Sequence, residues 1–237
     1  PDDVYDVMLD PERLHEWEVV DLYEKEVVKI SDQVLSTYLF YKVFFKDELL
    51  HFYVLLKDYF ESHSYKFRDA VYPVMETFDR EFVVSKLQKH VDKRWEEIKD
   101  DEPKLLRLME VFWFLKKTDT LLYLKERVDA LDARPFDIAE LVFEPEKHQD
   151  ISDRYLEVLE IFQHSGTEEF KIALEIVFTY LEKKLSLLPQ VLSLLLEKFC
   201  FSVKSYDYSY VIQRTLIDSL IGRTADERMG DFYKKIL

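Results

Sequence analysis

Glycine is nearly absent from this chain: Gly166, Gly222 and Gly230 are its only glycines in 237 residues. Tight β-hairpin turns draw on residues that tolerate positive φ, and glycine is the chief of these. A fold built from many hairpins is therefore excluded. The same scarcity excludes the glycine-rich phosphate loops, because neither GxGxxG nor GxxxxGK[ST] can be written with these positions. The sequence predicts a mostly α-helical protein.

Composition and charge narrow the class of partner. Apolar residues make up 48% of the chain and aromatic residues 15%, which excludes disorder as the dominant state. The 33 Lys and Arg residues face 48 Asp and Glu residues, for a net charge of −15. Nucleic-acid phosphates require clustered Lys and Arg, so a nucleic-acid-binding surface is excluded. We expect a protein or peptide partner, and a basic protein surface is attracted most readily.

Membrane spans and disulfides are not expected. A spanning helix needs about 18 consecutive apolar residues, and the longest candidate, 185–196, is interrupted by Pro189 and by polar residues. Cys200 is the only cysteine, so no internal disulfide can form, which fits a reducing cytoplasm. Pro1 is not an initiator methionine, and the helical pattern of 229–237 stops without a cap, so we expect a piece of a longer protein.

Residues 1–46 form a first segment that differs in kind from the rest. Two short β-favouring runs, 18–23 and 26–30, flank a polar Glu24-Lys25 turn and predict a single hairpin. Ser31 is then a favourable N-cap for a helix whose apolar residues recur at helical spacing through Phe45.

Residues 47–102 are predicted to be connecting helices. Three are expected, at 47–61, 65–78 and 79–99. Pro73 should bend or break the second of them, because an interior proline removes a backbone donor. The charged cluster 99–103, which ends in a proline, marks the clearest break in the chain.

Residues 103–237 contain helix pairs that resemble one another. The pairs are 108–115 with 120–131, 155–162 with 168–184, and 188–201 with 208–221. Matching Glu110 to Glu157 gives a spacing of 157 − 110 = 47 residues. Repeats of this length predict an α-solenoid, a helical-repeat array of the HEAT or armadillo kind. An irregular helical bundle is the alternative, because any two Leu-rich helical hairpins match loosely.

The chain carries no recognisable catalytic constellation. Its six histidines are scattered, none has a second His or Cys at a ligand spacing of three or four, and no HExxH occurs. One acidic loop carries a single imidazole: Glu144, Glu146, His148 and Asp150. This loop lacks the turn glycine of a calcium-binding loop, so we interpret it as a solvated loop between two helices. Adventitious binding of a metal ion is the alternative. Cys200 lies between aromatic residues, which predicts a buried thiol with a raised pKa.

Two aromatic clusters have a structural and a functional interpretation. The stretch 206–210 carries three tyrosines that could stack on a partner, or could simply cover a helix start. Phe112, Trp113 and Phe114 are consecutive, so they point around much of one helix and predict a helix covered on several sides.

The segment from Trp17 to Leu39 resembles the end of the winged-helix module of STAND signalling ATPases, the multidomain relatives of the apoptotic and plant-resistance ATPases. In that family a β-hairpin leads into a short motif of an apolar residue, His and Asp, after which a helix begins. Here Ile30, Ser31 and Asp32 fall on this motif, with Ser31 in place of the His. The resemblance covers about residues 1–46, plus the order of a winged helix followed by helical repeats.

In that family the motif His senses the β-phosphate of bound ADP and holds the resting state closed. The resemblance therefore implies that Ser31 and Asp32 are nucleotide-sensor candidates. It also implies that this chain is the C-terminal, regulatory part of such a protein, in contact with an upstream ATPase domain. The family's Walker A loop and Walker B acid are absent from these residues, so no catalytic, metal or cofactor site is expected within the chain.

Three hypotheses follow. The first is a non-catalytic regulatory and sensor segment of a STAND-type ATPase, with helical repeats that bind a protein or peptide trigger. The second is a free-standing α-solenoid scaffold that assembles partners. The third is an enzyme whose carboxylates, distant in sequence, converge only in the fold.

Overall fold

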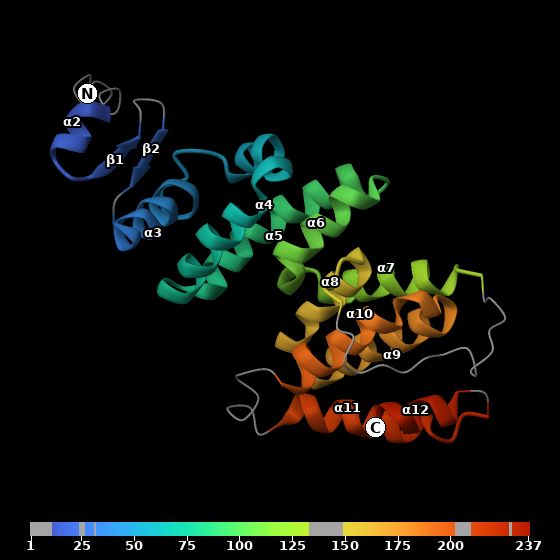
Figure 1. Cartoon of the computed structure of the whole chain (residues 1–237). Coiled ribbons are helices and arrows are strands. Elements are labelled where there is room, and N and C mark those ends of the chain that lie inside the picture. The colour runs from blue at the N-terminus through green and yellow to red at the C-terminus, as the bar shows by residue number, and fades with distance from the viewer. Residues whose placement is uncertain (1–10, 24–26, 31, 133–148, 202–209, 228) are drawn as a thin grey trace. The chain divides into compact units, whose positions relative to one another are not determined.

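A computed structural model describes residues 11–23, 27–30, 32–132, 149–201, 210–227 and 229–237, without the side chains of Arg13, Val27 and Val28. The chain forms two compact units (Figure 1), an N-terminal unit of residues 1–100 and a C-terminal unit of residues 101–237. The division falls between Asp100 and Asp101, inside the charged cluster 99–103. Both units are mostly helical, as the scarcity of glycine predicts.

The predicted hairpin is confirmed. It follows α2 (Pro11–Glu16) and consists of β1 (Val20–Tyr23) and β2 (Val27–Ile30), which pair antiparallel with Val20 opposite Ile30. These two strands form a two-stranded sheet, and the predicted Glu24-Lys25 turn lies outside the described residues.

Asp32, and not Ser31 as predicted, is the N-cap of the next helix, α3 (Gln33–Tyr41). Its Oδ1 accepts a hydrogen bond from the backbone N–H of Leu35 at 2.6 Å. Asp and Ser are comparably good caps, but a carboxylate also interacts favourably with the helix dipole. Ser31 lies outside the described residues. A π-helical turn, η1 (Lys42–Lys46), continues α3 and buries Phe45.

The predicted helices at 47–61 and 65–78 correspond to two helical stretches that meet at a kink and together make up α4 (Phe52–Thr77), so the first begins at Phe52 and not at Asp47. α4 is kinked at His63, where φ is −138° and ψ is 31°, and it continues through Pro73. The kink falls inside the polar run at 61–64, where Glu61 forms an ion pair with Arg94 of the next helix, with Oε1 3.1 Å from Nη2.

The core of the N-terminal unit lies between α4 and α5 (Arg80–Ile98). Asp79 caps α5, since its Oδ1 accepts a hydrogen bond from the N–H of Phe82 at 3.1 Å. Apolar side chains recur every three or four residues on the facing stripes, as packing of amphipathic helices requires. Those buried here include Phe52, Leu56, Phe60, Phe67, Val83, Leu87 and Val91.

The described part of the C-terminal unit consists mainly of helices. Its α-helices are α6 (Glu102–Phe112), α7 (Lys117–Asp129), α8 (Arg154–Glu160), α9 (Thr167–Lys183), α10 (Leu188–Ser193), α11 (Val211–Arg223) and α12 (Gly230–Ile236). Short 3₁₀ turns follow α6, α8 and α9: η2 (Trp113–Leu115), η4 (Ile161–His164) and η5 (Leu185–Leu187). A π-helical segment, η6 (Leu194–Cys200), extends α10.

Helices that the sequence analysis assigned to successive pairs pack on one another. The first helices follow the order α6, α8 and η6, while the second helices follow the order α7, α9 and α11. Figure 1 shows α9, in orange, between α7 and α11. The three consecutive aromatic residues do not share one helix, because α6 ends at Phe112 and the half-buried Phe114 lies with Trp113 in η2. α6 is nevertheless covered on more than one side, since it buries Leu105, Leu106, Leu108, Met109, Val111 and Phe112.

The connection between α6 and α7 is shorter than the predicted turn at 116–119. The 3₁₀ turn ends when Lys116 donates its N–H to the carbonyl of Trp113 at 3.0 Å, and α7 begins at Lys117. None of the described helices combines the length and the apolarity needed to cross a bilayer.

Candidate functional site

Of the two nucleotide-sensor candidates, Ser31 and Asp32, the structure describes only Asp32. Asp32 is exposed, and one of its carboxylate oxygens is occupied as the cap of α3. Ser31 lies outside the described residues. Capping α3 is enough to explain why an aspartate stands at position 32. The geometry of Asp32 therefore gives no separate evidence for a bound nucleotide.

The other candidate residues do not form a chemical site in the described part of the chain. Cys200 is half-buried, and burial raises the pKa of its thiol, as predicted. Tyr210 is exposed at the start of α11, whereas 206–209 lie outside the described residues, as do Glu144, Glu146 and His148. No group of three or more His, Cys, Asp or Glu side chains among the described residues is arranged to hold a metal ion.

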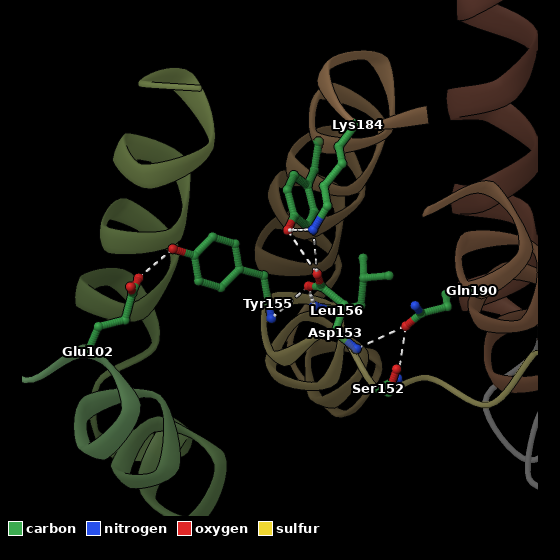
Figure 2. Close-up of polar contacts among 8 residues, drawn as sticks. Glu102, Ser152, Asp153, Tyr155, Leu156, Lys184 and Gln190 are labelled. Atoms are coloured by element: carbon green, nitrogen blue, oxygen red, sulfur yellow. Dashed lines mark hydrogen bonds and ion pairs between the residues drawn. The ribbon is translucent and has the colours of Figure 1, made fainter. Parts of the chain in front are cut away.

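A polar network joins the ends of successive helices in the C-terminal unit, and Asp153 lies at its centre (Figure 2). As the N-cap of α8, its Oδ1 accepts hydrogen bonds from the N–H groups of Tyr155 at 3.1 Å and Leu156 at 3.4 Å. Its Oδ2 accepts one from the Tyr180 hydroxyl of α9 at 2.9 Å, and Lys184 Nζ lies 3.3 Å away. One carboxylate therefore holds the start of α8 against the end of α9.

Gln190 of α10 extends this network to the third helix pair. Its Oε1 accepts hydrogen bonds from the backbone N–H groups of Ser152 at 2.8 Å and Asp153 at 2.9 Å. The side chain is buried, where an unsatisfied amide would be costly, so these bonds account for a polar residue inside an apolar helix.

Glu102 makes the corresponding connection on the other side of α8. It accepts a hydrogen bond from the Tyr155 hydroxyl and another, at 3.3 Å, from the Tyr123 hydroxyl of α7. Its Oε1 also lies 3.9 Å from Arg127 Nε. The first residue of α6 is thus bonded to both α7 and α8.

The electrostatics of this network favour a structural role. Burial raises the pKa of Tyr155, and its hydrogen bond to Glu102 raises that pKa further. Burial likewise raises the pKa of Tyr180, with the negative charge of Asp153 adding to it. Both phenols therefore stay protonated and donate to carboxylates, so neither is poised as a base or nucleophile.

An open groove between α7 and α9 is a better candidate for binding. Its volume is about 310 Å³, and it is lined by Lys125, Val128, Asp129, Lys171, Ile172, Glu175, Ile176 and Thr179. Ile172 is 47% exposed, although its neighbours in the groove include the buried Val128 and Ile176. An apolar floor with an exposed isoleucine is the kind of surface that accepts an apolar side chain of a partner.

Polar contacts fix the two helices at both ends of this groove. Lys117 Nζ lies 3.7 Å from Glu169 Oε1 near the two helix starts. At the other end Lys183 Nζ donates to the carbonyls of Asp129 and Leu131, each at 2.6 Å. These contacts fix the spacing of the two helices that line the groove.

Ion pairs also join the first helices of the same unit. Arg154 Nη1 of α8 lies 3.0 Å from Glu110 Oε1 of α6, and Lys198 Nζ of η6 lies 3.4 Å from Glu160 Oε1 of α8. These charges are satisfied within the unit.

The α7–α9 groove and the Asp153 network were not predicted from the sequence. A cap signal at Ser152-Asp153 was present, but Tyr180 and Gln190 lie 27 and 37 residues away from Asp153. No protein-family model, curated protein or solved structure matches this chain.

Proposed function

We propose that this chain is a non-catalytic regulatory and sensor segment of a STAND-type signalling ATPase, acting in the cytoplasm. Its C-terminal unit would bind a protein or peptide trigger through helical repeats. The observation that carries the proposal is the ordered packing of equivalent helices, with first helices on first helices and second helices on second helices. Solenoids of the HEAT or armadillo kind share this arrangement and present extended surfaces to proteins.

The N-terminal hairpin supports the connection to an ATPase. β2 ends at Ile30, and α3 begins directly after Asp32, so the order of hairpin, short motif and helix matches the resemblance. In this proposal the segment around Ser31 and Asp32 contacts an upstream nucleotide domain and restrains it.

The electrostatics support a role without catalysis inside this chain. Tyr155 and Tyr180 have raised pKa values and act as hydrogen-bond donors, and the raised pKa of Cys200 disfavours the reactive thiolate. The side chains that could have served an enzyme, Tyr155, Tyr180 and Cys200, are therefore explained by their structural roles.

Signalling would work by a population shift. A trigger can open a closed protein only by the difference in its affinity for the two states. Moving the equilibrium from 1:99 to 99:1 requires about 10⁴-fold tighter binding to the open state. The α7–α9 groove supplies a surface on which such a preference could depend.

A free-standing α-solenoid scaffold is the second candidate, and the same stacking of helices favours it. It needs no nucleotide domain, and it predicts partners that assemble on the groove without any change in nucleotide binding.

Release of a fluorescent ADP analogue from the whole protein tests the first proposal. We expect slower release from the intact protein than from a version that ends before residue 103, because the repeats hold the closed state. Equal release rates from both would contradict the regulatory role and favour the scaffold.

A further inference from the structure

We propose that the outer face of α11 binds a second copy of this chain, as an antiparallel pair of α11 helices related by a two-fold axis. In the order of second helices α11 follows α9 (Figure 1), and α12 also packs against it. The outer face is the part of α11 that these contacts leave open. The pairing neither uses the α7–α9 groove nor requires an ATPase domain.

α11 carries apolar residues on two sides. Arg223 fixes its inner side to α9, because Nη1 of this arginine lies 2.8 Å from Glu182 Oε1. The residues buried on the inner side are Thr215, Leu216 and Leu220. The apolar residues of the outer side, which are 37% to 51% exposed, are Val211, Ile217 and Ile221. A helix that is apolar on both sides is normally covered on both, so the outer side lacks a neighbour in a single copy.

The outer side has the residue spacing of a helix-pairing seam. Four exposed residues are separated by three, four and three positions: Val211, Arg214, Asp218 and Ile221. This is the heptad spacing at which two helices pack along each other. Within the described part of the chain, Arg214 and Asp218 form no ion pair with each other or with a third residue, although their i,i+4 spacing would allow one. The described fold of a single copy therefore does not use these two charges.

This seam is complementary to itself in one orientation. In an antiparallel pair, a two-fold axis at the level of residue 216 sets Arg214 of each copy opposite Asp218 of the other. The same axis sets Val211 of each copy opposite Ile221 of the other. A parallel pair would instead set Arg214 against Arg214 and Asp218 against Asp218. Charged residues in a seam specify orientation and register, so these two select an antiparallel second copy as the occupant.

Sedimentation equilibrium of the full chain tests the pairing. α11 has 13 residues and is about 20 Å long, so the interface is small and we expect a weak dimer. The measurement should therefore extend from about 10 μM to about 1 mM protein. Asp218→Arg should weaken the dimer at least about tenfold, because it sets like charges against each other at two places in the seam. Arg214→Asp should weaken it to a similar extent for the same reason.

The double variant Arg214→Asp with Asp218→Arg restores opposite charges in the same register, so it should dimerise like the wild type. Glu126→Arg, at an exposed position of α7, makes the same change of charge outside the seam and should also dimerise like the wild type. The proposal is overturned if the wild type stays monomeric at about 1 mM, or if Asp218→Arg and Glu126→Arg behave alike. A double variant that dimerises no better than the single variants would overturn it as well.

Discussion

Tyr180 donates its hydroxyl hydrogen to Asp153 across 2.9 Å, so the second helix of one pair is bonded to the cap of the first. The same carboxylate caps α8 with its other oxygen. Asp153 therefore stabilises both the start of α8 and the packing of α8 against α9.

Asp153→Ala should destabilise the protein by about 2–3 kcal/mol, because it removes an N-cap and leaves the buried Tyr180 hydroxyl without its acceptor. Urea unfolding measures the change. Asp153→Asn is the control: asparagine caps comparably and can still accept from the phenol, so it should lose clearly less. If the two variants lose the same amount, the cap and the phenol bond do not have the roles given to them here.

Glu110 should make stability depend on pH. Burial raises the pKa of its carboxyl above the ordinary 4.5, even though Arg154 lowers it. The folded protein therefore favours the protonated carboxyl of Glu110. This contribution to the free energy of unfolding is present below about pH 4.5 and is lost as the pH rises through the raised pKa. Glu110→Gln has no such loss, so its free energy of unfolding should rise relative to the wild type between pH 4.5 and 7. A difference that stays constant over this range would contradict the prediction.

The α7–α9 groove offers a matched pair of substitutions. Ile172 is 47% exposed, whereas Ile176, one turn along the same helix, is 3% exposed. Ile172→Asp should change the free energy of unfolding by about 0.5 kcal/mol or less, while Ile176→Asp should cost about 3 kcal/mol or more, since it buries a charge. Thermal unfolding separates the two. A large loss in Ile172→Asp would mean that the isoleucine belongs to the core and is not available to a partner.

Local features of the fold were predictable from sequence, whereas those that depend on distant partners were not. The hairpin follows from two β-favouring runs, and the helix starts follow from residues such as Asp79. The ion pair between Glu61 and Arg94 joins residues 33 positions apart, and no local pattern reports it. The polar run at 61–64, by contrast, indicated the interruption of helical backbone that the structure has at His63.

The candidate sites, too, were predictable from sequence only where they depend on neighbouring residues. The sequence identified Asp32 as a residue at a helix start, but placed the cap itself one residue earlier. The α7–α9 groove combines side chains from helices about fifty residues apart, and the network around Asp153 combines α8, α9 and α10. Periodicity indicates which faces are apolar, but it does not indicate which of them the fold leaves open.

The reading frame upstream of Pro1 tests the central claim most directly, and sequencing the encoding gene provides it. The account predicts a GxxxxGK[ST] loop followed by an acidic strand end, on the order of a few hundred residues before Pro1, as the parts of a nucleotide switch. A start codon within a few residues of Pro1 would contradict it. This chain would then be a self-contained helical protein, and the scaffold proposal would replace the regulatory one.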